Sequence, residues 1–181
     1  FTAAQKTQGI LTQGMFTIGQ TMAAYVGQNY GSKDIKRIRQ GIAASLKIFV
    51  VYSIVAGVLI VLFLKPTLAV FFKSGTDLTP FIPFARTYIL ESAICYIFLA
   101  MIFIYRNTMQ AVGHAFMAMM MGISELIGRL IMSFISIKTH QYWLAVGSDP
   151  IAWAVAGILG LFLCRYVLKM VEKEFMKGSS D

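Results

Sequence analysis

The chain has 181 residues, of which 57% are hydrophobic and only 13% are charged, and its mean hydropathy is +0.70. A soluble domain carries about 25% charged residues, so the composition excludes an ordinary soluble domain and indicates an integral membrane protein. The net charge is +8, and because the basic residues gather at the ends of apolar runs, they suit lipid head groups rather than nucleic acid, which we do not expect as a partner.

Five segments are long enough to cross a bilayer, which takes about 20 apolar residues. We therefore predict an all-α integral membrane protein with five transmembrane helices, at residues 8–29, 43–64, 84–109, 116–137 and 150–170. Residues 171–181 have mixed charge and are expected to form a cytoplasmic tail. The chain starts with Phe1 and has no signal peptide, which indicates a sequence that begins inside a longer protein.

A basic strip follows the first span: Lys33, Lys36, Arg37 and Arg39 stand against the single acid Asp34. Counted with residues near the ends of the spans, ten Lys and Arg residues, the strip included, fall on this side of the membrane and five fall on the other. The positive-inside rule therefore places the strip and the C-terminus in the cytoplasm of a multi-pass protein of the plasma (inner) membrane. We interpret the strip as a cytoplasmic loop whose four bases anchor the topology.

Three of the ionisable residues within the predicted spans are candidates for a functional role, because a charge inside the bilayer costs about 2.5–3.5 kcal/mol on insertion scales. Glu125 and Arg129 stand at i and i+4 in GISELIGRL, on one face of the fourth span. They form either a self-neutralising pair that tethers neighbouring helices or a polar station on a substrate or ion pathway. Glu91, near the start of the third span, is either an interfacial carboxylate or a group that binds a proton or cation.

The ends of two spans carry further polar residues. Arg106 stands with Asn107 and Gln110 in IYRNTMQAVG, and Gln28 and Asn29 end the first span. An arginine at this depth extends to the head groups or makes a gating or lobe-linking contact. The chain has no Ser/His/Asp set, no H-E-x-x-H and no phosphate-binding loop. We therefore expect no enzyme activity, no catalytic residue, no metal site and no cofactor.

Four stretches together resemble the multidrug and toxic compound extrusion (MATE) family of transporters. These are GQTMAAYVGQNYGSKDIKRIRQG, IYRNTMQAVG, GISELIGRL and DPIAWAVAG, which occur in the order and spacing of that family. The resemblance implies that residues 1–181 are a partial C-terminal transmembrane lobe, corresponding to the last five of twelve helices. It also implies that an N-terminal lobe and a seventh helix are needed as partners.

The implied function is secondary active antiport, in which a Na⁺ or H⁺ gradient drives export of drugs or other amphipathic organic compounds by alternating access. Within this resemblance, Glu91 is the candidate for the coupling carboxylate, and the chain alone is expected to be inactive. One alternative is a flippase for lipid-linked oligosaccharide from the same superfamily, which would favour a large cationic cavity. The other is a membrane scaffold that does not transport, which would need no charges inside the membrane.

Overall fold

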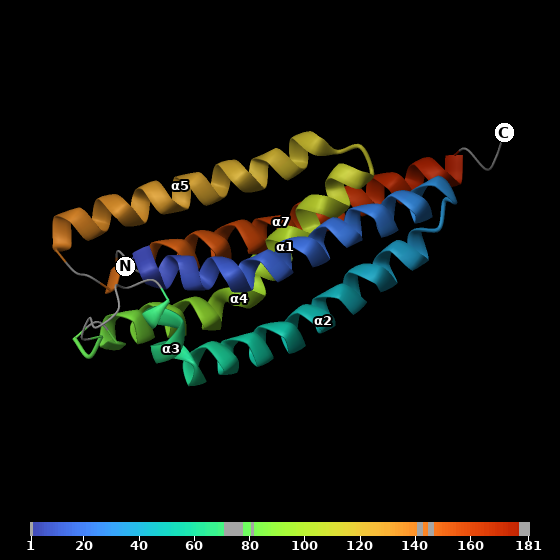
Figure 1. Ribbon diagram of the computed structural model, residues 1–181. Coiled ribbons are helices and arrows are strands. Elements are labelled where there is room, and N and C mark those ends of the chain that lie inside the picture. Colours follow the sequence, from blue (N-terminus) through green and yellow to red (C-terminus); the bar gives the residue numbers. More distant parts are fainter. Residues whose placement is uncertain (1, 71–77, 81, 141–142, 145–146, 178–181) are drawn as a thin grey trace.

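Long antiparallel helices, packed side by side, make up the part of the chain that a computed structural model describes, namely residues 2–70, 78–80, 82–140, 143–144 and 147–177 (Figure 1). The helices are α1 (Thr2–Gly31), α2 (Ile35–Leu62), α3 (Leu64–Ala69), α4 (Ile82–Ala111), α5 (Ala115–Thr139) and α7 (Ser148–Lys177). The α1–α2 turn, the α4–α5 turn and the end of α7 all lie at one end of the bundle (Figure 1).

The five-span prediction is not confirmed. Among the described residues, α2, α5 and α7 are long and apolar enough to cross a membrane. Helix α4 is a fourth span if its halves Ile82–Leu90 and Cys95–Ala111, which are bent by 52° relative to each other, count as one. Helix α1 is long enough, at 30 residues, but its many Thr and Gln residues make it too polar.

Two threonine hydroxyls of α1 form hydrogen bonds with backbone carbonyls of the same helix. The hydroxyl of Thr17 donates to the carbonyl of Gln13 at 3.1 Å, and that of Thr21 donates to the carbonyl of Thr17 at 3.1 Å. These bonds hide hydroxyls from an apolar environment without needing a partner helix. Helix α1 can therefore lie in the bundle, against α2 and α4, although hydropathy does not identify it as a span.

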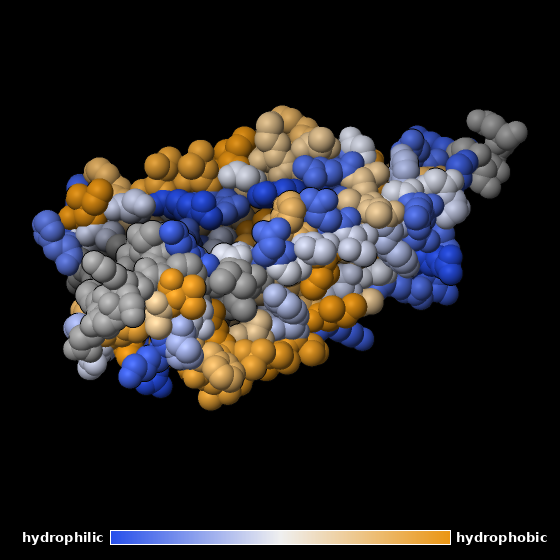
Figure 2. All heavy atoms as spheres, viewed as in Figure 1, coloured by the Kyte–Doolittle hydropathy of each residue, from blue (hydrophilic) through white to orange (hydrophobic). Residues whose placement is uncertain are grey.

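Helix α4 lies at the centre of the bundle and packs against α1, α2, α5 and α7. Its side chains Tyr96, Ile104 and Met109 are almost fully buried, and the ring of Tyr96 lies 6.3 Å from that of Trp153 in α7. By contrast, α2 and α5 expose apolar side chains outward, visible as orange surface in Figure 2. The outward faces of these two helices thus have the character expected of surfaces that meet lipid or further helices.

The basic strip is not a loop, contrary to the sequence-based prediction. Helix α2 begins at Ile35, so Lys36, Arg37 and Arg39 lie in its first turns. The cause is Asp34, which caps the helix: its Oδ1 accepts a hydrogen bond from the backbone N–H of Arg37 at 2.9 Å. Lys33 makes the preceding turn with a φ of 56°. The bases remain exposed at the end of the bundle.

Replacing the capping residue should loosen the start of α2. We expect Asp34→Ala to cost about 1 kcal/mol, because the N–H of Arg37 loses its acceptor. Hydrogen exchange measured by mass spectrometry should then be faster over the first turn of α2. Asp34→Asn is the matched control, since Asn also caps helices and should keep the exchange slow. Equal exchange in the Ala variant and the wild type would show that the cap does not hold this turn.

Helix α7 continues beyond residue 170, where the sequence places the start of a tail, as far as Lys177. Two contacts hold this last part against the bundle. The rings of Tyr30 and Phe175 lie 5.3 Å apart, and Arg39 forms an ion pair of 2.7 Å with Glu172. The end where α1 meets α2 and α7 terminates is therefore a packed and strongly polar surface, blue in Figure 2.

Candidate functional site

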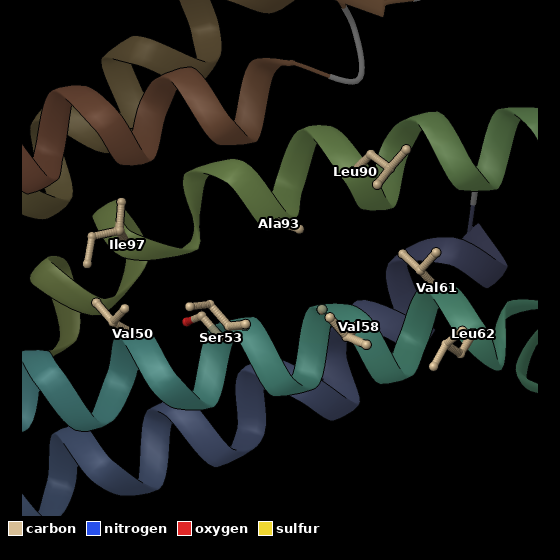
Figure 3. Close-up of a pocket in the computed structure, with 10 residues that line it drawn as sticks. Val50, Ser53, Val58, Val61, Leu62, Leu90, Ala93 and Ile97 are labelled. Atoms are coloured by element: carbon tan, nitrogen blue, oxygen red, sulfur yellow. The ribbon is translucent and has the colours of Figure 1, made fainter.

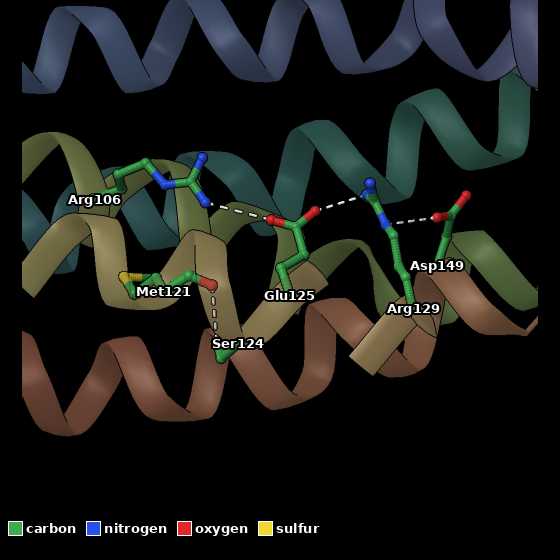
Figure 4. Close-up of polar contacts among 6 residues, drawn as sticks. All are labelled: Arg106, Met121, Ser124, Glu125, Arg129 and Asp149. Carbon is green, nitrogen blue, oxygen red and sulfur yellow. Dashed lines mark hydrogen bonds and ion pairs between the residues drawn. The ribbon is translucent and has the colours of Figure 1, made fainter. Parts of the chain in front are cut away.

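Four charged side chains from three helices form a continuous chain of ion pairs (Figure 4). Arg106 of α4 lies 3.3 Å from one carboxylate oxygen of Glu125 in α5, and Arg129 lies 2.7 Å from the other. The Nε of Arg129 also lies 3.0 Å from Oδ1 of Asp149, in the first turn of α7. Positive and negative groups alternate along this series of ion pairs, and the two positive charges balance the two negative ones.

Each helix presents its member for a local reason. Glu125 and Arg129 lie one helical turn apart on α5, in the order that favours pairing. Asp149 lies at the N-terminus of α7, where the helix dipole favours a carboxylate. Gly128 lets α5 approach α7, since a Cβ there would lie 3.2 Å from the Cα of Ala152. The ion pairs therefore depend on close packing of α5 against α7.

The two arginines beside Glu125 determine whether its carboxylate can bind a cation. Its side chain is only 17% exposed, and each of its two oxygens accepts from one arginine. A carboxylate held in this way is a poor site for a cation, because both guanidinium groups repel positive charge. In this conformation the geometry favours a tether between α4, α5 and α7. A role in an ion pathway would require one of the pairs to open.

The sequence anticipated only part of this arrangement. The expected pair of Glu125 and Arg129 is present, whereas Arg106, which was expected at the head groups or against another lobe, instead extends to Glu125. Its Nε is buried without a hydrogen-bond partner among the described residues. Asp149 was not identified as a candidate at all. The available signal was an acid at the start of an apolar helix, where a base on a neighbouring helix can pair with it.

The remaining candidates at the ends of the helices are mainly positioning residues. The side-chain amide of Asn29 donates to the carbonyl of Tyr25 at 2.8 Å, and the carbonyl of Asn29 accepts from the N–H of Asp34 at 2.9 Å, which closes the α1–α2 turn. Asn107 donates to the carbonyl of Phe103 at 2.7 Å. Gln28 is exposed, and so is Gln110, which lines a shallow groove beside Arg106.

Glu91 lies in α4 at the bend, but its side chain is outside the described residues. The neighbouring hydroxyls of Ser92 and Tyr96 are buried and have no hydrogen-bond partner in the described part of the chain. Unpartnered buried hydroxyls are costly inside a membrane. The region around the bend is therefore a polar place in an otherwise apolar interior.

An apolar groove of about 610 Å³ runs between α2 and α4 beside this bend (Figure 3). Leu90, Ala93 and Ile97 of α4 form one wall. The facing wall belongs to α2 and includes Val50 and Ser53, and Ser53 supplies the one hydroxyl among the described residues of the lining. Such a surface suits apolar or amphipathic molecules and offers little to a highly charged ligand.

A family model described as MatE matches residues 1–135 of the chain. The matched region includes Arg106, Glu125 and Arg129 and ends before Asp149. No curated protein and no solved structure matches the chain.

Proposed function

Because the chain belongs to the MatE family of membrane transporters, we propose that it forms part of a secondary active transporter of the plasma (inner) membrane. In this proposal a gradient of Na⁺ or H⁺ drives export of drugs or other amphipathic organic compounds by alternating access. The helices described above would form part of one lobe. An N-terminal lobe and a further helix would supply the remainder, so the chain alone would not transport.

The observation that carries the proposal is the family match, and two structural features support it. The apolar groove between α2 and α4 has the lining that amphipathic compounds require. The ion-pair chain joins α4, α5 and α7 into one unit. A lobe that moves as a rigid body during alternating access needs internal links of this kind.

Glu91 is the carboxylate that we propose for coupling. Glu125 is a weaker candidate, because both of its oxygens are occupied by arginines. Glu91 lies on the central helix, at the bend, and directly precedes Ser92, whose buried hydroxyl has no hydrogen-bond partner among the described residues. Binding of a proton or Na⁺ there would shift the transporter between its two states if one state binds the cation more tightly.

Ethidium accumulation in efflux-deficient cells tests this function. Cells that express the complete reading frame containing residues 1–181 should accumulate less ethidium than cells with an empty vector. The difference should vanish when the cation gradient is collapsed. Glu91→Gln should abolish the difference too, because the amide cannot take up the cation. Glu174→Gln is the control, since Glu174 lies exposed near the end of α7.

Two outcomes would contradict the proposal at different levels. If the protein is present in the membrane and ethidium accumulates as in the empty-vector cells, drug export is wrong. The flippase and scaffold alternatives would then be tested next. If the Glu91→Gln variant exports as well as the wild type, export stands and Glu91 is not the coupling carboxylate.

A further inference from the structure

A second groove, of about 190 Å³, lies between α2 and α7 at the basic end of the bundle. Its lining includes Arg39, Ile42 and Leu46 from α2, and Leu161 and Arg165 from α7. The ring of Tyr105, from α4, is also part of the lining and is only 5% exposed. The groove thus combines two arginines with a lining of buried and half-buried apolar side chains.

The groove exists because α2 and α7 both pack against α4 and make only slight contact with each other. The ion pair of 2.7 Å between Arg39 and Glu172 bridges the two helices at the mouth of the groove. Below that bridge, the space between the helices is lined by apolar side chains. An elongated apolar molecule can therefore lie along the groove without displacing a helix.

The mouth of the groove is suited to an anion. Arg165 is exposed and makes no ion pair with any residue that the structure describes. Arg39 donates to Glu172 through Nη2, and its guanidinium group has further N–H donors. Guanidinium groups bind phosphate oxygens strongly, often through two hydrogen bonds at once. The two arginines thus offer more positive charge than the single carboxylate of Glu172 neutralises.

The depth of the two arginines matches a lipid head group. The apolar run of α7 ends at Cys164, directly before Arg165, and the apolar run of α2 begins shortly after Arg39. Basic pockets between transmembrane helices at this level bind anionic head groups. Ile42, Leu46 and Leu161 lie on the side of the arginines that faces the bilayer core, where an acyl chain would extend.

We propose that this groove binds one anionic phospholipid, with its phosphate on Arg39 and Arg165 and an acyl chain against Ile42, Leu46 and Leu161. The site differs from general attraction of lipid to the basic end, because it needs two particular arginines and the space between α2 and α7. It also goes beyond transport, since lipid binding can be measured when no substrate moves.

Native mass spectrometry of the complete protein tests the site. After equilibration with equal amounts of phosphatidylglycerol and phosphatidylcholine, the wild type should retain phosphatidylglycerol preferentially. Replacing both arginines, Arg39→Gln with Arg165→Gln, should lower that retention about tenfold or more, because the phosphate loses both guanidinium partners, and a tenfold loss corresponds to about 1.4 kcal/mol. Ala43→Trp should lower it as well, because Ala43 lines the groove and the indole would fill it without changing any charge.

The matched control is Lys36→Gln with Lys173→Gln, which removes the same charge from the same end but from outside the groove. This control should retain phosphatidylglycerol nearly as well as the wild type. An equal loss in the control and the arginine variant would overturn the proposal, because binding would then follow net charge alone. Undiminished retention in Ala43→Trp would also overturn it, because the groove would not hold the chain.

The wild type gives a second test that needs no variant. Added phosphatidylglycerol should raise the thermal unfolding midpoint of the complete protein in detergent, whereas phosphatidylcholine and inorganic phosphate should not. A rise of the same size with inorganic phosphate would mean that the arginines bind a free anion and not a lipid. These readouts are independent of ethidium export, so failure here leaves the transport proposal intact.

Discussion

Exchanging Glu125 and Arg129, by combining Glu125→Arg with Arg129→Glu, is expected to lower the free energy of unfolding by about 3–5 kcal/mol. An isolated pair at i and i+4 would tolerate this exchange, because opposite charges would still face each other. In the four-member chain, the exchange sets an arginine against Arg106 and a glutamate against Asp149. Two attractive contacts become repulsive, and the groups at position 125 are largely buried.

A four-residue reversal should rescue this variant. Adding Arg106→Glu and Asp149→Arg restores the alternation of charges along the whole chain, and most of the lost stability should return. Thermal unfolding of the complete protein in detergent would measure both effects. The control exchanges Arg39 with Glu172, an ion pair whose side chains are 49% and 37% exposed. That exchange should change stability by only about 0.2–1 kcal/mol.

The exchange variant also separates the two interpretations of the pair. If it is as stable as the control exchange, then Glu125 and Arg129 neutralise each other and the contacts to α4 and α7 add nothing. If the exchange variant is unstable and the four-residue reversal rescues it, the series of ion pairs is a tether between three helices. A loss of transport in a variant of normal stability would instead favour a role on the substrate or ion pathway.

Hydropathy alone was sufficient to find α2, α5 and α7. Each contains a long apolar run, and the third predicted span, 84–109, lies within the observed Ile82–Ala111. The predicted span 8–29 likewise lies within α1, Thr2–Gly31, but α1 is too polar to count as a span by hydropathy. Its Thr hydroxyls are satisfied by its own carbonyls, which a hydropathy average cannot register. The predicted second span starts at residue 43, whereas α2 starts at Ile35. The four bases were interpreted as a loop, although Asp34 is a residue type that favours the N-cap of a helix.

The candidate site was predictable only as far as it is local. Glu125 and Arg129 share one helix, so the helical period places them together. Arg106 is 19 positions from Glu125, and Asp149 belongs to another helix. These residues meet only because of how α4, α5 and α7 pack against one another. The spacing of residues along the sequence does not predict that packing. Pairing each intramembrane base with an acid would have been the useful additional rule.

Replacing Gly157 with alanine is expected to destabilise the packing of α7 against α4. A Cβ at this position would lie 2.9 Å from the carbonyl oxygen of Phe98 and 3.3 Å from its Cα, both backbone atoms of α4. Backbone cannot rotate away as a side chain can, so the helices must separate. Overpacking of this kind costs about 1–3 kcal/mol, and Gly157→Leu should cost more. Small residues allow such close approach between membrane helices.

Two other glycines provide matched controls for the same substitution. At Gly160 the added Cβ would meet the terminal methyl group of Met121, which can move aside, so Gly160→Ala should cost less. At Gly27 no described atom lies within 4 Å, and Ala should stabilise the helix by up to about 1 kcal/mol. Thermal unfolding midpoints should therefore fall in the order Gly27→Ala, Gly160→Ala, Gly157→Ala. If Gly157→Ala unfolds at or above the midpoint of Gly160→Ala, backbone contact does not set the distance between α4 and α7. The backbone contact at Gly157 would then not be what brings Arg106 of α4 and Asp149 of α7 close enough to belong to the same series of ion pairs.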